Sequence, residues 1–260
     1  MSNRWIFPTK KNNTNAGSTC CLVRSFDVQD ILYEDNHLLI INKQPSAIVQ
    51  GDKTGDEPLS ETLKNYIKQK YHKPGEVFLG VVHRLDRPVS GAVIFARTSK
   101  SLTRLNLMLK EGNIHKTYWA VVHHRPPKPE DCLTGYILRN EKQNKSYCYE
   151  SPVAGSQTAE LKYRVMGHSD RYFLLEVKLI TGRHHQIRAQ LASIGCPIKG
   201  DLKYGYPRSN PGGFIHLHAR SLEFLHPVKH ESIRIIAQPI PDPLWDFFSR
   251  SVDSLSNFQA

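Results

Sequence analysis

The sequence predicts an α+β fold, with a mixed, largely antiparallel β-sheet and helices packed beside it. Three observations support this class. Short apolar runs rich in β-branched residues outnumber the amphipathic helical segments. Several of these runs are joined by short polar segments that are typical of hairpins. The chain also lacks an internal repeat, a G-x-G-x-x-G motif and a phosphate-loop lysine motif, so nothing favours a doubly wound parallel sheet.

The first half of the chain alternates between strand and helix patterns. Apolar residues at 31–33 and 38–41 flank a polar turn at 34–37, which predicts a hairpin. Residues 58–71 place Leu59, Leu63, Tyr66 and Ile67 on one face of a helix that the Pro74-Gly75 pair follows. The runs 77–82 and 92–96 predict strand, loop, strand. A second helix starts at about Ser99, the expected N-cap, and ends near Gly112.

The second half predicts more strand. Residues 118–122 form a strongly strand-like run, and residues 146–158 are polar and rich in turn formers, as in a surface loop or hairpin. Residues 172–180 alternate, which places Phe173, Leu175, Val177 and Leu179 on one face. Asp242 as N-cap and Pro243 at the first helical position open a short helix near the end of the chain.

Composition limits the classes of function. Lysine and arginine number 35 against 24 aspartates and glutamates, a net charge of +11, and 39% of residues are hydrophobic. A basic globular chain attracts polyanions, which favours RNA or DNA as a partner. No apolar run is long enough to span a bilayer. The odd set of five cysteines lacks zinc or disulfide spacing, and no apolar signal core precedes residue 28, so a cytoplasmic protein is expected.

Three segments are expected along the chain. Residues 1–28 form a flexible basic arm, residues 29–250 a single catalytic domain, and residues 251–260 a tail. A monomer without an obligatory protein partner is the default expectation.

Residues 83–91, His-Arg-Leu-Asp-Arg-Pro-Val-Ser-Gly, contain the most informative chemistry. Asp86 lies between Arg84 and Arg87, on a predicted loop between buried strands. Nearby cations favour the ionised form of a carboxylate, so the two arginines are expected to keep Asp86 charged and ready to act as a nucleophile or base. The alternative for such a pattern is an ion pair that only holds the loop.

A second informative segment covers residues 181–195. Thr181 is the expected cap of a helix that directs Ile187 and Leu191 toward the core. Arg183 would then lie in the first turn, where it contacts phosphate or remains a solvated charge. Arg188 lies near the buried stripe and needs a carboxylate partner, for which Asp86 is the expected choice and a structural ion pair elsewhere the alternative.

Together these segments resemble the RluA-type pseudouridine synthases. The first segment is similar to that family's H-R-L-D-x-x-T-S-G motif, and the others follow in the family's order from about residue 31 to 230. The matching segments are 83–91 (HRLDRPVSG), 116–122 (KTYWAVV), 181–188 (TGRHHQIR), 195–205 (GCPIKGDLKYG), 216–219 (HLHA) and 224–227 (FLHP). Several ordered motifs are far more specific than any one of them.

The resemblance implies a pseudouridine synthase fold with a catalytic cleft across its sheet, no cofactor, and ribosomal or transfer RNA as substrate. It implies catalytic roles for Asp86, Tyr118 and Arg188, with Arg188 paired to Asp86 and Tyr118 against the target base. Without the resemblance, Tyr118 would be interpreted as core packing. Arg84 would fill the space left by a flipped uridine. The expected substrate-binding residues are Arg84, Arg87, Arg183, His184 and Gln186.

Some features leave alternatives open. Val89, His184 and Gln190 stand where the family commonly has threonine, threonine and histidine, which puts the choice of RNA in doubt more than the reaction. His216 and His218 would share a strand face, as zinc ligands can, but no cysteine or glutamate at ligand spacing supports a metal site. A non-catalytic RNA-binding protein on the same fold and a nucleic-acid glycosylase are the competing classes of function.

Overall fold

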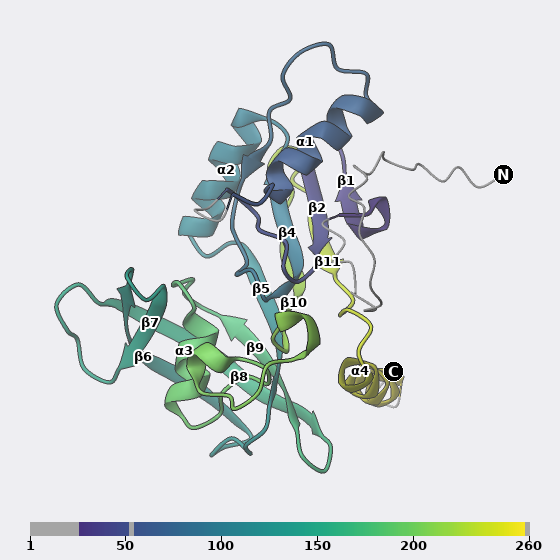
Figure 1. Ribbon diagram of the computed structural model, residues 1–260. Helices are drawn as coiled ribbons and strands as arrows, with labels where there is room; N and C mark the ends of the chain where they lie inside the picture. The colour runs from purple at the N-terminus through teal and green to yellow at the C-terminus, as the bar shows by residue number, and fades with distance from the viewer. Residues whose placement is uncertain (1–25, 52–54, 258–260) are drawn as a thin grey trace, which may run out of the picture.

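A computed structural model describes residues 26–51 and 55–257 (Figure 1). Most of the expected N-terminal arm, residues 1–25, lies outside the described residues, as do the last three residues of the expected tail. No described helix is long and apolar enough to cross a membrane.

The described chain forms a sheet of 11 strands in the order β1-β2-β4-β10-β5-β9-β8-β6-β7, with β11 paired to β10 and β3 to β4. Strand pairing is antiparallel throughout except between β4 and β10, so the predicted mixed, largely antiparallel sheet is confirmed. The strands are β1 (Ile31–Glu34), β2 (Leu38–Lys43), β3 (Gly80–Val81), β4 (Ser90–Ala96), β5 (His115–Val122), β6 (Glu130–Asn140), β7 (Lys145–Tyr149), β8 (Gln157–His168), β9 (Phe173–Leu179), β10 (Leu217–Leu225) and β11 (Ser232–Ile236).

Four α-helices cover the sheet: α1 (Leu59–Lys70), α2 (Ser99–Lys110), α3 (Gln186–Ser193) and α4 (Pro243–Asn257). α1 and α3 pack into one apolar cluster of the core, whereas α2 and α4 pack into two others. In Figure 1, α1 and α2 lie beside β1, β2 and β4, and α3 lies beside β6–β9. Alternate residues of β5 pack on opposite faces of the sheet. Tyr118 and Ala120 belong to the apolar cluster that contains α1 and α3. Trp119 and Val121 belong to the cluster that contains α4.

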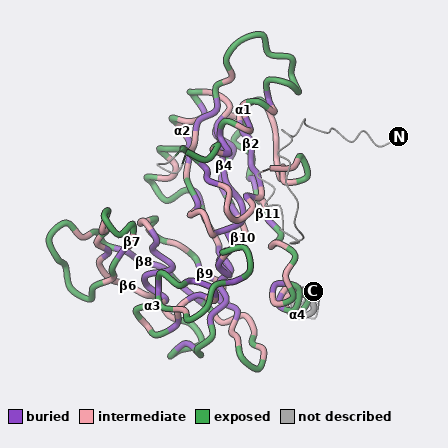
Figure 2. Tube along the Cα trace, in the orientation of Figure 1, coloured by how far each residue is buried: buried purple, intermediate pink, exposed green. Residues whose placement is uncertain are grey.

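The most deeply buried part of the sheet is formed by β2 and β4. Every residue of β4 is buried, as is almost all of β2 (Figure 2). Strands that are covered on both faces are continuous apolar runs rather than alternating ones, and the β4 sequence SGAVIFA fits that description. These two buried strands support the loop that precedes β4.

Local signals located most elements and misplaced some boundaries. The hairpin of β1 and β2 and the helix α1 are confirmed. The N-cap of α2 is Thr98, one residue before the expected cap Ser99, because the hydroxyl of Thr98 accepts from the Ser101 N–H at 3.1 Å. Only Gly80–Val81 of the expected 77–82 strand pairs. Residues 146–158 contribute β7 and the start of β8, both of which pair with β6.

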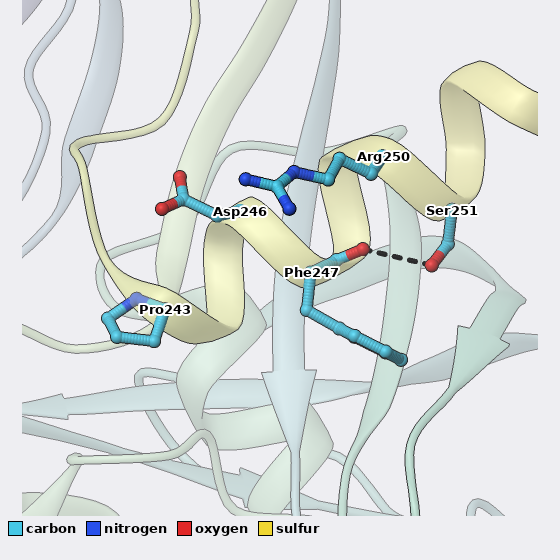
Figure 3. Close-up of a pocket in the computed structure, with 5 residues that line it drawn as sticks. All are labelled: Pro243, Asp246, Phe247, Arg250 and Ser251. Carbon is cyan, nitrogen blue, oxygen red and sulfur yellow. Dashed lines mark hydrogen bonds between the residues drawn. The ribbon is translucent and has the colours of Figure 1, made fainter.

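α4 begins as expected and runs further. The Asp242 carboxylate accepts from the backbone N–H groups of Leu244 and Trp245 at 3.0 and 3.2 Å, which confirms the cap. Trp245 is buried on the sheet, while Phe247 is half-exposed on the outer face of the helix beside Arg250 (Figure 3). Because α4 continues to Asn257, the domain boundary expected at residue 250 falls inside a helix.

Candidate active site

The loop between β3 and β4 presents Asp86 from a fixed base. Leu85 and Val89 on either side are buried in the core, and the Val89 N–H donates to the Asp86 carbonyl at 3.0 Å. The Arg87 carbonyl accepts from the Ser46 N–H at 2.8 Å and from the Lys43 ammonium at 3.3 Å. The backbone on which Asp86 stands is therefore tied to the core on both sides.

Gly91 makes the start of β4 possible. Its φ of +118° is one that residues with side chains rarely adopt, and a Cβ here would collide with the backbone of Ala219. β4 and β10 run parallel at this point, with Gly91 opposite Ala219. The glycine of the 83–91 motif therefore lets two strands approach closely just behind the Asp86 loop.

Arg188 of α3 forms the ion pair with Asp86 that its sequence position predicted. Its Nη1 donates to Asp86 Oδ2 at 2.9 Å. On its other side the guanidinium binds Asp201 through two contacts, Nε to Oδ2 at 2.6 Å and Nη2 to Oδ1 at 2.8 Å. Both Arg188 and Asp201 are buried, so this two-point contact fixes the direction from which the guanidinium approaches Asp86.

The groups that keep Asp86 ionised differ from expectation. Burial works to raise the pKa of the Asp86 carboxyl, but His185, Arg188 and His184 act against it, and the net pKa lies below its usual value. Arg87 instead pairs with Asp56 at 2.7 Å, and Arg84 forms no ion pair with the described chain. Neither Arg84 nor Arg87, which were expected to hold Asp86 ionised, is among the groups with the largest effect on its pKa. The carboxylate of Asp86 is nevertheless ionised at neutral pH.

Asp86, Tyr118 and Arg84 all line one small cavity of about 80 Å³. Burial and the charge of Asp86 both raise the pKa of Tyr118, so its phenol keeps its proton at neutral pH. Arg84 is exposed, whereas Tyr118 is buried in β5. The cavity residues are Arg84, Leu85, Asp86, Val89, Tyr118, Leu179, Arg183, His185, Gln186, Ile187, Arg188 and Leu217. The three predicted catalytic residues are thus brought together from a loop, a strand and a helix.

The entry to α3 differs from the sequence prediction. Thr181 does not cap the helix; its hydroxyl contacts the Gln186 side chain at 2.9 Å and accepts from the Glu160 N–H at 2.8 Å. The helix begins only at Gln186, after His185 in the left-handed conformation with φ of +53°. Arg183 therefore lies before the helix rather than in its first turn, and its Nε donates to the Thr158 carbonyl at 2.9 Å.

Two of the expected substrate-binding side chains are engaged within the protein. Gln186 accepts from the Arg183 N–H at 2.9 Å and donates to the Glu160 carbonyl at 3.0 Å, so its carboxamide holds the 181–183 segment in place. His184 is half-buried, stacks on His185 and contacts the hydroxyl of Ser146. Arg84 and Arg183 line the cavity, whereas the Arg87 side chain pairs with Asp56 and is not part of the cavity lining.

Three neighbours of Asp86 were not identified from the sequence. His185 places Nε2 at 3.4 Å from Asp86 Oδ2. Asp201 orients Arg188, and Lys43 lies buried behind the loop, where burial lowers the pKa of its ammonium to about 7 although the charge of Asp86 acts to raise it. Asp201 could have been identified from the sequence, because it is the aspartate of the matching GCPIKGD segment. Lys43 could have been identified as a buried lysine, because it directly follows the strand-like segment LLIIN.

The buried His218 in β10 and His216, which directly precedes that strand, are bound to neighbouring protein groups. His216 contacts Asp242 at 3.0 Å and Asn210 at 3.0 Å, and His218 contacts Ser90 and the Ala237 carbonyl. Within the described ranges, no group of three or more histidine, cysteine, aspartate or glutamate side chains is placed to hold a metal ion.

A mixed sheet with an aspartate loop, a tyrosine strand and an arginine helix around one cavity defines the class of RNA-modifying isomerases that the sequence motifs indicated. Residues 37–193 match the sequence model of the family described as RNA pseudouridylate synthase. This range is more than half of the chain, and the chain belongs to that family.

Individual relatives agree with this assignment. An uncharacterized RNA pseudouridine synthase of Bacillus subtilis is 35% identical over 215 residues, which cover 82% of this chain and 68% of the relative. Ribosomal large subunit pseudouridine synthase D of Xylella fastidiosa is 33% identical, with coverages of 83% and 67%. tRNA pseudouridine synthase C of Pectobacterium carotovorum is 30% identical, with coverages of 80% and 58%. This chain therefore matches 58% to 68% of the length of these three proteins.

The fold is also found in a solved structure. Human RNA pseudouridylate synthase domain-containing protein 4 superimposes with a TM-score of 0.70 at 22% sequence identity, covering 86% of this chain and 93% of the other. The same architecture is thus retained at low sequence identity.

Proposed function

We propose that this protein converts specific uridines of ribosomal or transfer RNA to pseudouridine, with Asp86 as the catalytic carboxylate. The observation that carries the proposal is the state of Asp86: ionised, held by Arg188 at 2.9 Å, and facing a cavity with Tyr118. The reaction breaks the bond from N1 of uracil to C1′ of ribose and forms one from C5 to C1′. The C5 proton leaves and N1 gains one, so no redox cofactor is required.

Each catalytic side chain has a task that suits its position. The Asp86 carboxylate acts as nucleophile or base, since Asp86 lines the cavity and only Arg188 donates a hydrogen bond to its carboxylate among the described residues. Arg188 keeps the carboxylate ionised and directed. Tyr118, a neutral phenol in a buried strand, lies against the uracil ring and supplies one hydrogen-bonding group.

The rim of the cavity binds the RNA. A uridine in a folded RNA has to leave its stack to reach Asp86, and Arg84 is exposed beside the cavity with a planar head that can fill the gap. Arg87 and Arg183 contact phosphates, which adds affinity without reading sequence. The net charge of +11 supports a polyanionic substrate, and the relatives named above for ribosomal and transfer RNA support these two RNA classes.

A nucleotide-resolution map of pseudouridine in the host RNA tests the proposal. We compare an intact strain, a deletion strain, and deletion strains that express the wild-type chain or Asp86→Ala. A site that disappears on deletion, returns with the wild-type chain and stays absent with Asp86→Ala is the expected result. Four identical maps would leave RNA binding without catalysis as the function, and free uracil released by the purified protein would identify a glycosylase.

A further inference from the structure

Two adjacent histidines at the entry of α3 form a stacked pair beside the catalytic carboxylate. The ring centroids of His184 and His185 are 3.8 Å apart, with an angle of 20° between the ring planes. His185 adopts φ of +53°, a conformation that is uncommon for a residue with a side chain. Such backbone conformations persist where the surroundings hold them, and they occur often at functional sites.

Both rings are held by β7, the edge strand of the sheet. His184 Nδ1 lies 2.8 Å from the Ser146 hydroxyl, and His185 Nδ1 lies 2.9 Å from the Tyr204 hydroxyl. The Ser146 N–H in turn donates to the same Tyr204 oxygen at 2.8 Å. Ser146 is buried. It holds His184 directly through its hydroxyl, and it holds His185 indirectly, because its backbone N–H binds the Tyr204 hydroxyl that contacts His185.

These contacts favour one tautomer of His185, with the hydrogen on Nε2. Because the Tyr204 oxygen already accepts from Ser146, its own hydrogen is free to be donated to His185 Nδ1. A neutral imidazole that accepts at Nδ1 carries its hydrogen on Nε2. Nε2, the nitrogen that carries this hydrogen, lies 3.4 Å from Asp86 Oδ2, close enough for charge–dipole attraction to the carboxylate.

His185 is a neutral group at this position. Burial lowers the pKa of its imidazole to about 3, although the nearby Asp86 acts to raise it. Arg188 therefore supplies the permanent positive charge at Asp86 Oδ2, and His185 supplies a directed dipole on the same oxygen.

On the basis of the function proposed above, we propose that His185 positions the Asp86 carboxylate through its Nε2–H, and that His184 is a second positioning residue that acts through His185. The stack with His184 and the bond to Tyr204 fix the plane of the His185 ring. Arg188 and His185 both act on Oδ2, which leaves Oδ1 directed toward the cavity.

The hairpin of β6 and β7 also becomes part of the catalytic arrangement. Lys145, next to Ser146, lies 5.4 Å from the ring centroid of Tyr147 and 5.2 Å from that of Tyr204. A cation and an aromatic ring on an edge strand are groups that contact RNA. The hydrogen bonds of Ser146 therefore connect Lys145 and Tyr147, which are suited to RNA contact, with the histidines beside Asp86.

The first test uses the tautomer of His185, which can be observed without RNA. ¹⁵N NMR spectra of the histidine-labelled protein should give His185 the shifts of an imidazole protonated on Nε2. Tyr204→Phe removes the hydroxyl that selects this form and should produce a mixture of tautomers. A wild-type His185 protonated on Nδ1, or a tautomer unaffected by Tyr204→Phe, would overturn the proposal. This result does not depend on whether the protein modifies RNA.

The second test separates positioning from binding. Single-turnover assays use the unmodified form of the RNA that the protein modifies. His185→Phe should slow the reaction roughly tenfold to a hundredfold, because small displacements of a reacting group have effects of this size. The Kd for RNA should change less than about threefold. His185→Gln, which restores an N–H donor, should recover part of the rate. His184→Thr and Ser146→Ala should produce smaller losses of the same kind.

The contrary outcomes are equally defined. A wild-type rate for His185→Phe, or an equal loss of rate in His185→Gln and His185→Phe at unchanged melting temperature, would refute the positioning role. Loss of RNA affinity in parallel with rate would make the pair a binding element instead. If the wild-type protein modified no RNA at all, the proposed function would fail, while the tautomer experiment would still decide on the arrangement of the pair.

Discussion

Two aspartates of this protein, Asp35 and Asp86, both lie beside a cation and a histidine, yet only one is suited to catalysis. Asp35 accepts from the N–H groups of His37 and Leu38 through Oδ1, at 2.7 and 2.8 Å. Its Oδ2 contacts Tyr33 at 3.0 Å, His226 at 2.9 Å and Lys229 at 3.0 Å. Every lone pair of this carboxylate is therefore occupied by the protein.

Asp86 has far fewer partners. Its carboxylate accepts one hydrogen bond, from Arg188 Nη1, with His185 Nε2 at 3.4 Å from the same oxygen. Within the described part of the chain, Oδ1 has no hydrogen-bond donor. The side chain of Asp86 is 28% exposed, against 14% for that of Asp35. Unused acceptor capacity facing a cavity distinguishes a carboxylate that can react from one that only stabilises the fold.

The direction of a pKa shift does not make this distinction. Burial acts to raise the pKa of both carboxyls, and in both cases the net pKa lies below the usual value because hydrogen bonds and charges oppose it. At Asp35 backbone N–H donors contribute strongly, whereas at Asp86 the contributions come from His185, Arg188 and His184. Perturbed pKa values indicate a functional site only together with geometry.

The sharpest test of this comparison exchanges one atom at each position. Asp86→Asn should reduce pseudouridine formation at least about a thousandfold, since loss of an essential catalytic group has effects of this order. Asp35→Asn should keep the catalytic rate within about threefold, but should lose about 1–3 kcal/mol of unfolding free energy, because an NH2 group replaces the oxygen that Tyr33, His226 and Lys229 contact. Rates and urea unfolding curves for the two variants measure both quantities. Similar activity in the two variants would refute the distinction.

The next largest effect is expected at Arg188. Arg188→Met leaves Asp201 buried without a partner, and breaking a buried pair in this way typically costs about 3–5 kcal/mol of unfolding free energy. Arg188→Lys keeps the charge but loses the two-point contact with Asp201, so its stability should fall between that of Arg188→Met and that of the wild type. Chemical denaturation at neutral pH compares the three proteins. Full stability of Arg188→Met would show that Asp201 is satisfied in another way.

The smallest effect concerns the two lysines near these carboxylates. Hydrogen bonding to Asp35 raises the pKa of Lys229, whereas burial lowers the pKa of Lys43 from 10.5 to about 7. Between pH 7 and 10.5 the unfolded chain therefore holds more protons on Lys43 than the folded chain does. Stability rises with pH wherever this is so.

Lys43→Met removes this contribution. The variant should show a less positive slope of unfolding free energy against pH from 7 to 10.5 than the wild type, whereas Lys229→Met should not reduce the slope in this way. Unfolding curves at several pH values in this interval provide the measurement. Equal slopes for the wild type and Lys43→Met would mean that Lys43 remains charged in its buried position.

The sequence alone was sufficient for the fold class and most elements. The β1–β2 hairpin, the α1 helix and the Asp242 cap of α4 depend on side-chain spacing and on contacts within a few residues, and such patterns can be interpreted before folding. The pairing of Arg188 with Asp86 was predicted because a buried guanidinium requires a carboxylate and the family motifs offered this one.

Tertiary structure decided the partners. Arg84 and Arg87 neighbour Asp86 in sequence, but Arg87 pairs with Asp56, and Arg188, 102 residues later, forms the ion pair with Asp86. Thr181 had a good capping position, but the Gln186 side chain and the Glu160 N–H engage its hydroxyl and the helix starts five residues later. His185 approaches Asp86 because of its left-handed backbone conformation and the contacts of its ring with Tyr204 and His184. Spacing along a chain determines local conformation, but the direction of a side chain and the group that it meets depend on how distant segments pack.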